Sequence, residues 1–382
     1  MIKSFTATTR EIDDTEAAVA EIKNQLDPDN RLLKNSIGII SCFSEFEESG
    51  VLKAICDALP FECVGASTCL CAGCGEIDQV LFVITVLTSD DCSFKTAVAP
   101  ISEKYEESIE SALSNLMDQG GVKPALILTY LPLIPAVSGD MMIEVMDRIT
   151  GGLPLFGAMA IDHYLDYHSA GTIYKGKMIH DALSVAAIYG NPKFTFEVAS
   201  FLESRTMSQR AIITESKGNI LMGVNGIAPR DYFKQFGMTD EELSIGMSFL
   251  PLVVDHKDGT KPIARAVFAI TPEGYAVCGG VMPANRTLTL ASIDRDDVAD
   301  TTENILKTLA AKDSALFSYS CLARYLTLGM NNKDEAEKVK EAAKESPYIF
   351  AYTGGEICPL PDANGKLKNI FHNYTNVFCL LS

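Results

Sequence analysis

Side chains that could bind a small polar molecule occur in a few short motifs of this sequence. Arg324 carries a planar guanidinium group, which can bind a carboxylate through two hydrogen bonds. Glu356 and Asp162 carry oxygens that suit an ammonium group. Backbone N–H groups in the segments Ser67-Thr68 and Gly354-Gly355 could donate to anionic oxygens. Together these residue types predict a site for an amino acid or a similar small polar ligand.

Histidine adds a further candidate to this site. His372 and His180 each stand shortly before an apolar run, which gives them matching positions in the sequence. The shared position favours a role at the ligand site, or as axial nitrogens of a haem group. A histidine hydrogen-bonded at the start of a strand would give the same pattern. Arg324 and Glu356 also have a structural alternative, because they could pair with each other across adjacent loops.

Three cysteines close together in the sequence could bind a metal. Cys69, Cys71 and Cys74 combine C-x-C and C-x-x-C spacing, and three thiolates could hold zinc or an iron–sulfur centre if another residue supplied the fourth ligand. Cys42, Cys92 or a histidine are the candidates for that ligand. The C-x-x-C pair could instead be redox-active, with a lowered thiol pKa. Ordinary free thiols in a turn of small residues are the third interpretation.

The elements that must position these residues form a repeat of about eighty residues that occurs three times. Each copy has a short apolar run, an amphipathic helix, a second apolar run ending in small residues, and a third run after a variable loop. The copies comprise residues 36–42, 50–59, 61–65 and 80–87; then 125–130, 139–150, 153–157 and 181–189; then 315–320, 333–345, 348–352 and 373–381. A further helix is expected before each copy, at 14–26, 102–119 and 297–311.

Short runs rich in Val, Ile, Leu and Phe that alternate with helical patterns are typical of parallel β-α-β units. We therefore predict an α/β fold with mixed sheets built from repeated α-β-α-β-β units. Residues 194–293 have shorter strands and turns, so the chain is expected to form two associated domains, 1–224 and 225–382.

The direction of these strands predicts where a ligand would bind. In right-handed crossovers both strands run the same way, so the loops at their carboxyl ends share one edge of the sheet. The candidate residues of all three copies follow such strands. We expect them to surround one pocket that the N- and C-terminal halves of the chain share, with the copies specialised around it.

Composition excludes several other classes of protein. The formal charge of −18 over 382 residues argues against a nucleic acid or an anionic membrane as the main partner, since both need basic surface. The start of the chain has no apolar segment of a secretory signal, and no apolar run reaches the roughly twenty residues that span a bilayer. A cytoplasmic location is expected, where most of the eleven cysteines would be reduced.

Several of these motifs resemble one known family. The segments TGGEI at 353–357, HNYT at 372–375 and FSYSCLAR at 317–324 are similar to the C-terminal part of the FIST family, which occurs in bacterial and archaeal sensory proteins. VGAST at 64–68 resembles its first glycine motif, and LPLFGAMAID at 153–162 its second. The resemblance runs from about residue 30 to the end of the chain. The cysteines after the first motif, and a missing paired glycine in the second, depart from the family pattern.

The resemblance implies a module that senses small ligands in signal transduction, with amino acids as the usual proposal. Some family members bind haem and respond to nitric oxide, which makes a metal- or haem-containing redox sensor the alternative. No cofactor is required by the sequence itself. Because no output domain is recognisable, the signal would pass to a separate output protein or act through the state of a homo-oligomer.

Catalysis is the least favoured function. The sequence has no P-loop, no H-E-x-x-H, no G-x-S-x-G and no well-placed G-x-G-x-x-G motif. Cys321 and His372 could form a nucleophile pair of an acyl-transfer or hydrolytic enzyme, because both are expected at the same sheet edge. The chain is therefore predicted not to be an enzyme.

Overall fold

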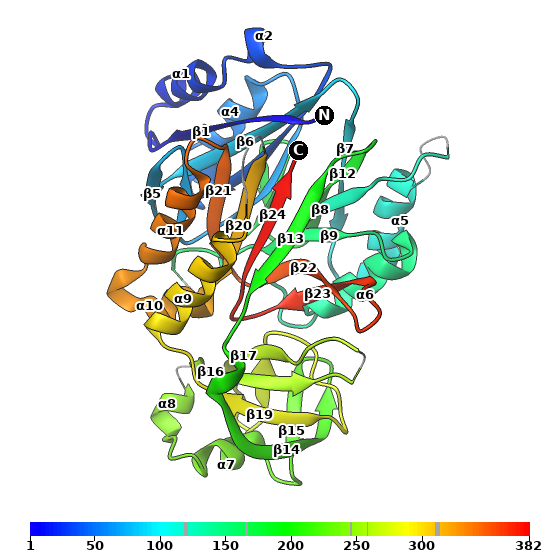
Figure 1. The fold of residues 1–382 in the computed structure, drawn as a ribbon, viewed down its shortest axis with the longest axis vertical. Helices are drawn as coiled ribbons and strands as arrows, with labels where there is room; N and C mark the ends of the chain where they lie inside the picture. The colour runs from blue at the N-terminus through cyan, green and yellow to red at the C-terminus, as the bar shows by residue number, and fades with distance from the viewer. Residues whose placement is uncertain (118–120, 165–166, 245–246, 258, 310–313) are drawn as a thin grey trace.

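The computed structural model describes residues 1–117, 121–164, 167–244, 247–257, 259–309 and 314–382. It contains three six-stranded sheets and one closed barrel of six strands. Figure 1 shows the barrel at one end of the molecule and both chain ends among the three sheets. We call the three sheets with their helices the body. This arrangement confirms the predicted α/β class with mixed sheets built from repeated units.

Each repeat copy forms four consecutive strands of one sheet. The first copy comprises β1 (Lys3–Thr9), α1 (Thr15–Leu26), α2 (Pro28–Arg31), β2 (Asn35–Cys42), α3 (Glu45–Glu48), α4 (Val51–Asp57), β3 (Cys63–Ser67) and β6 (Phe82–Ser89). The second comprises β7 (Ser93–Pro100), α5 (Tyr105–Met117), β8 (Leu126–Leu131), α6 (Gly139–Thr150), β9 (Leu155–Met159) and β12 (Ala182–Tyr189). The third comprises β13 (Phe194–Ala199), α9 (Arg295–Leu306), β20 (Ala315–Cys321), α10 (Leu322–Leu328), a 3₁₀ turn (Gly329–Asn331), α11 (Asp334–Ala343), β21 (Tyr348–Thr353) and β24 (Asn376–Leu381). The expected ends of the helices 102–119 and 297–311 lie partly outside the described residues.

The variable loops predicted between the second and third runs contain hairpins, and each hairpin completes the sheet of another copy. The hairpin β4 (Cys71–Gly73) and β5 (Glu76–Asp78) of the first copy pairs with β21 of the third. The hairpin β10 (Thr172–Tyr174) and β11 (Lys177–Ile179) of the second pairs with β3 of the first. The hairpin β22 (Glu356–Pro361) and β23 (Leu367–His372) of the third pairs with β9 of the second. The exchange is therefore cyclic.

Alternating side chains of the strands separate two kinds of core. One face of each sheet turns to a shared centre, where the corresponding residues Ser41, Tyr130 and Tyr319 occupy the same position in the three first strands. The hydroxyl oxygens of Tyr130 and Tyr319 are 2.9 Å apart there. The opposite face of each sheet packs on its own helices. In α6, for example, Met142 and Met146 are fully buried, as the helical spacing of apolar residues predicts.

Glycine allows the close approach of parallel strands in the second copy. β8 and β9 place Gly157 opposite Thr129. A Cβ atom at position 157 would lie 1.8 Å from the carbonyl oxygen of Thr129, which no side chain can tolerate without a backbone shift. The glycine motif at the end of this strand is therefore explained by packing.

The barrel is inserted between β13 and α9 of the third copy. Its strands are β14 (Thr206–Lys217), β15 (Ile220–Val224), β16 (Met247–Asp255), β17 (Ile263–Ile270), β18 (Ala276–Cys278) and β19 (Thr287–Ala291), with a 3₁₀ turn (Glu203–Arg205), α7 (Pro229–Lys234) and α8 (Asp240–Ser244) in the connections. The predicted domain junction near Asn225 lies directly after β15, inside this barrel. The barrel has a separate apolar core.

Buried polar contacts hold the barrel against the body. Arg265 of β17 is fully buried, and its Nη2 donates to both carboxylate oxygens of Asp140 in α6, at 2.9 and 3.0 Å. Its Nη1 donates to the carbonyl oxygen of Phe371 in β23, at 2.7 Å. The N–H of Ala266 donates to Oδ1 of Asn373 at 3.2 Å. These contacts place β17 beside the end of the exchanged hairpin β22–β23.

Within the described part of the chain, no helix combines the length and apolar composition that crossing a membrane requires.

Candidate functional site: a cavity between the body and the barrel

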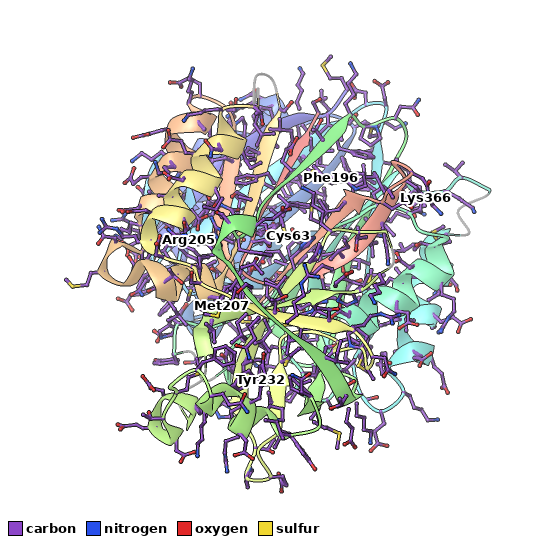
Figure 2. The ribbon with its side chains drawn as sticks, turned by 60° about the horizontal axis from the view of Figure 1, so that its bottom comes forward. Cys63, Phe196, Arg205, Met207, Tyr232 and Lys366 are labelled. Carbon is purple, nitrogen blue, oxygen red and sulfur yellow. The ribbon has the colours of Figure 1, made fainter. Side chains whose placement is uncertain are left out.

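A large cavity lies where the barrel meets the body. Its volume is about 1120 Å³, which slightly exceeds the usual range of ligand pockets. On the body side β13 and the hairpin β22–β23 form its wall, and on the barrel side β14, β16, β17 and β19 form it. Figure 2 labels Phe196 of β13 and Met207 of β14, which line the cavity from these two sides.

The wall of the cavity combines apolar surface with charges of both signs. Its apolar residues come mainly from β13, from the start of β17 and from the Pro359–Pro361 segment. Basic groups are Arg210 of β14 and Lys261, which comes shortly before β17. Acidic groups include Glu197 of β13 and Asp255 of β16. Such a mixture suits a ligand that has both an apolar part and charged or polar groups.

His372, at the end of β23, lines the cavity as a predominantly buried residue, only 2% exposed. Its Nε2 lies 3.0 Å from the carbonyl oxygen of Cys358. A carbonyl can only accept a hydrogen bond, so Nε2 carries the proton in this contact. Burial, and to a smaller degree the charge of Arg265, lowers the pKa of His372 to about 4. The ring is therefore neutral near pH 7.

Glu356 lies behind the cavity and does not line it. β22 and β23 pair Glu356 with His372. The carboxyl group is fully buried and accepts hydrogen bonds from Thr375 at 2.7 Å and Thr353 at 3.1 Å. Burial raises the pKa of Glu356 well above its ordinary value, which favours the protonated form. Thr375 lines the cavity, so one threonine hydroxyl separates this carboxyl from it.

Arg324 lies in the core of the third copy. Each of its three guanidinium nitrogens donates to a protein oxygen. Nε and Nη2 both donate to the carboxylate of Glu335, and Nη1 donates to the carbonyl of Tyr374. Nη2 also donates to the hydroxyl groups of Thr301 and Thr302. Both Arg324 and Glu335 are fully buried, and their closest atoms are 2.8 Å apart. Glu335 is therefore the acid in direct contact with Arg324, where the sequence suggested Glu356. The guanidinium expected to bind a ligand carboxylate is occupied inside the protein.

The loops after the second strand of each copy meet, as the repeat predicted. The N–H of Ile161 donates to the carbonyl of Ser67 at 3.2 Å, and the hydroxyl of Thr68 donates to the carbonyl of Tyr352 at 2.6 Å. The N–H of Gly354 donates to the carbonyl of Met159 at 2.9 Å. These contacts fill the junction. The N–H groups of Ser67, Thr68 and Gly354 bond to protein carbonyls, and none of the three residues lines the large cavity.

Asp162 is buried at the same junction. Its Oδ2 accepts hydrogen bonds from the N–H and the hydroxyl of Ser169, at 3.0 and 3.2 Å. Gly355 follows Gly354 in the turn between β21 and β22, and a Cβ atom added to it would lie 2.3 Å from the ring of Phe371. Of the residues predicted to bind the ligand, His372 is the one that lines the cavity.

Comparison with family models settles the origin of these motifs. A model described as the FIST N domain matches residues 36–227, and one described as the FIST C domain matches residues 230–359. The chain belongs to the FIST family. FIST domains are regarded as small-ligand sensory domains of signal transduction, so the resemblance noted in the sequence is confirmed. The border between the two matches falls within the barrel.

Other comparisons add little to the FIST assignment. No curated protein matches the chain. Among solved structures, one described as "Cyanuric acid hydrolase: evolutionary innovation by structural concatenation" is 11% identical and covers 76% of this chain and 99% of its own, with a TM-score of 0.30. A similarity this weak says nothing about the function of this FIST protein.

The three cysteines of the predicted metal site, Cys69, Cys71 and Cys74, lie in different environments. Cys71 lies in the central core, and its thiol approaches the carbonyl of Leu81 at 3.4 Å. Cys74 is exposed, and its thiol lies 3.0 Å from the carbonyl of Thr6. Burial raises the pKa of Cys69 to about 12 and that of Cys74 to about 11, so neither thiol is activated. Among the described residues no group of three or more His, Cys, Asp and Glu side chains could hold a metal ion. Cys69, Cys71 and Cys74 therefore do not come together as the set of ligands that a zinc or iron–sulfur centre would need.

The two histidines proposed as haem ligands occupy different positions. The hairpin β22–β23 pairs His372 with Glu356, whereas the corresponding hairpin β10–β11 pairs Ile179 with Thr172. His180 is thus one residue out of register with His372. Its Nδ1 lies 2.9 Å from the carbonyl of Ala170, and it is not part of the cavity wall. The predicted equivalence of the two histidines is wrong by one residue.

The sequence analysis missed most of the cavity wall, because the wall comes from the barrel and from β13. The barrel occurs once, so comparison of the repeat copies could not indicate its residues. One signal was present: residues 194–198 alternate between apolar and polar types, which is typical of a strand with one exposed face.

Proposed function

We propose that this FIST protein is a sensor that binds an amino acid or a similar small polar ligand in the cavity between the body and the barrel. The observation that carries the proposal is the cavity itself, with its apolar wall, its charges of both signs and the buried His372. Lys261 and Arg210 are suited to a ligand carboxylate, and Glu197 or Asp255 to an ammonium group. These residues replace Arg324 and Asp162 as the candidate charged contacts.

The location of the cavity suggests how binding would be signalled. The body and the barrel both contribute to the wall, so a ligand that contacts both would favour one placement of the barrel over others. A separate output protein that contacts both parts, or a second copy of the chain, would read this change.

A binding role is also favoured over catalysis by the environment of Cys321. Burial raises the pKa of its thiol well above the ordinary value, and the nearby Glu356 acts in the same direction. A nucleophilic cysteine needs the opposite shift. Cys321 is not among the residues of the cavity wall, whereas His372 is. We therefore propose that the chain is not an enzyme.

A ligand screen with matched variants tests the proposal. The full chain is heated with each of the common amino acids, and any that raises its Tm is measured by titration calorimetry. A ligand at one hundred times its Kd is expected to stabilise the protein by about 2.7 kcal/mol. Lys261→Ala should weaken binding of the selected amino acid. Lys123→Ala, which changes an exposed lysine of the second copy, should leave it unchanged. Absence of stabilisation by every amino acid, or equal binding by both variants, would overturn the proposal.

A further inference from the structure

The ring of His372 offers one nitrogen to a ligand and uses the other to hold its position. The Nε2–H group donates to the carbonyl of Cys358 at 3.0 Å. Nδ1 has no hydrogen-bond partner among the described residues, and His372 lines the cavity while being 2% exposed. In a neutral imidazole with Nε2 protonated, Nδ1 is an acceptor. Nδ1 is not among the described buried side-chain atoms that lack a partner, so it is accessible from the cavity, and a ligand that covers it without donating would leave it unpaired. Binding therefore gains most from a ligand that donates to it.

We propose that His372 determines ligand specificity by requiring a neutral hydrogen-bond donor, such as an amide N–H or a hydroxyl group, from the ligand. This inference rests on the proposed function and deepens it, because it names the chemical group that distinguishes ligands from non-ligands. His372 acts here as a binding residue in its own right.

A carboxylate cannot satisfy this position. Its two oxygens only accept hydrogen bonds, so a carboxylate facing Nδ1 would place two acceptors against each other. Discrimination of this kind is strong, because the wrong ligand leaves buried polar groups unpaired. An anionic group of the ligand belongs instead with Lys261 or Arg210, which lie on the barrel side of the cavity.

An ammonium group is disfavoured by the charges around His372. From β17, Arg265 donates to the carbonyl of Phe371, the neighbour of His372 in β23, so a buried positive charge is already close. Asp140 of α6 balances that charge by its contact with Arg265. From β22, Glu356 is the acid paired with His372, and its burial favours the neutral form. A second positive charge at Nδ1 would be close to that of Arg265, whereas a neutral donor adds no charge there.

Two pairs of amino acids of nearly equal shape test the inference: L-glutamine against L-glutamate, and L-asparagine against L-aspartate. In each pair the first member ends in a neutral amide donor and the second in a carboxylate. We expect the amide to bind the full chain at least tenfold more tightly than its acid. His372→Phe should remove this preference with the Tm of the free protein and its circular dichroism otherwise close to wild type. His180→Phe, a histidine outside the cavity wall, is the matched control and should keep the preference.

A measurement without ligand separates this inference from the proposed function. A long-range ¹⁵N–¹H spectrum of the labelled protein near pH 7, assigned by loss of the His372 signals in His372→Phe, reports which ring nitrogen carries the proton. We expect protonated Nε2 and unprotonated Nδ1. A proton on Nδ1 overturns the inference even if amino acids bind. An acid that binds as tightly as its amide does the same. The expected tautomer together with no binding of any common amino acid overturns the proposed function, and with it the ligand class inferred from it.

Discussion

Replacing Arg324 by methionine should lower the free energy of unfolding of the protein and should have no specific effect on ligand binding. The guanidinium and the carboxylate of Glu335 are both fully buried, 2.8 Å apart. Glu335 also accepts hydrogen bonds from Thr302 and Ser320 at 2.6 and 2.7 Å, and from Asn376 at 3.0 Å. Removing one partner of such a pair leaves a buried charge uncompensated, which costs about 3–5 kcal/mol.

The assay is urea denaturation at 25 °C followed by circular dichroism. Arg324→Met should lower the free energy of unfolding by that amount, and the double variant Arg324→Met/Glu335→Met should be more stable than the single one, because it removes both charges. Arg148→Met is the control. It breaks an ion pair with Glu106 whose side chains are 57% and 52% exposed, so its loss of stability should be small beside that of Arg324→Met.

The result that would refute this reasoning is a variant of Arg324 with unchanged stability and lost ligand binding. That outcome would return Arg324 to the ligand site, as its residue type alone suggested. A double variant less stable than Arg324→Met would show instead that the remaining charge of Glu335 is not the source of the loss.

Three further predictions follow from the packing and the titration of single residues. Gly157→Ala should lower the free energy of unfolding by at least about 2 kcal/mol, because the new Cβ would clash with the carbonyl of Thr129; near-wild-type urea denaturation would contradict the close approach of β8 and β9. His372 has a folded pKa of about 4 against an ordinary 6.5, so the unfolded chain takes up its proton first, and the wild type should lose up to about 3 kcal/mol as the pH falls from 6.5 to 4. His372→Gln should show a smaller loss over the same range, and equal slopes of stability against pH would refute the neutral buried ring. Asp140→Asn should loosen the barrel, costing about 2 kcal/mol and exposing residues near Arg265 to protease; unchanged cleavage would show that this contact does not hold the barrel.

Much of the body could be predicted from local sequence patterns. The helix expected at 139–150 is α6, and the three apolar runs and the helix of the first copy correspond to β2, β3, β6 and α4. These elements are encoded by side-chain periodicity, which a single segment contains in full. The pairing of the hairpins could not be predicted in the same way, because it joins segments hundreds of residues apart.

The candidate site was predicted less well, for reasons that its residues make plain. Arg324 and Glu356 have the residue types of a ligand site, but residue type does not indicate which partner a charge finds. Glu335 comes one helix later and takes the guanidinium. His372 was predicted from a repeat position shared with His180, and that equivalence is wrong by one residue. His372 lines the cavity because the barrel packs beside the exchanged hairpin, which the repeat did not indicate. Lys261 and Arg210 belong to the inserted barrel, where no repeat could identify them.

The cyclic exchange of hairpins has a consequence for the synthesis of this protein. The hairpin β4–β5 is made early, yet its partner strand β21 leaves the ribosome much later, and the contact between Thr68 and Tyr352 beside it spans 284 residues. At a translation rate of about 5–20 residues per second, that interval lasts on the order of tens of seconds. During this time the hairpin β4–β5 has no partner strand. The edge of β3 also stays unpaired until β10 has been synthesised. We therefore expect the nascent chain to depend on chaperones, and its yield to fall when translation is slowed between the second and third copies.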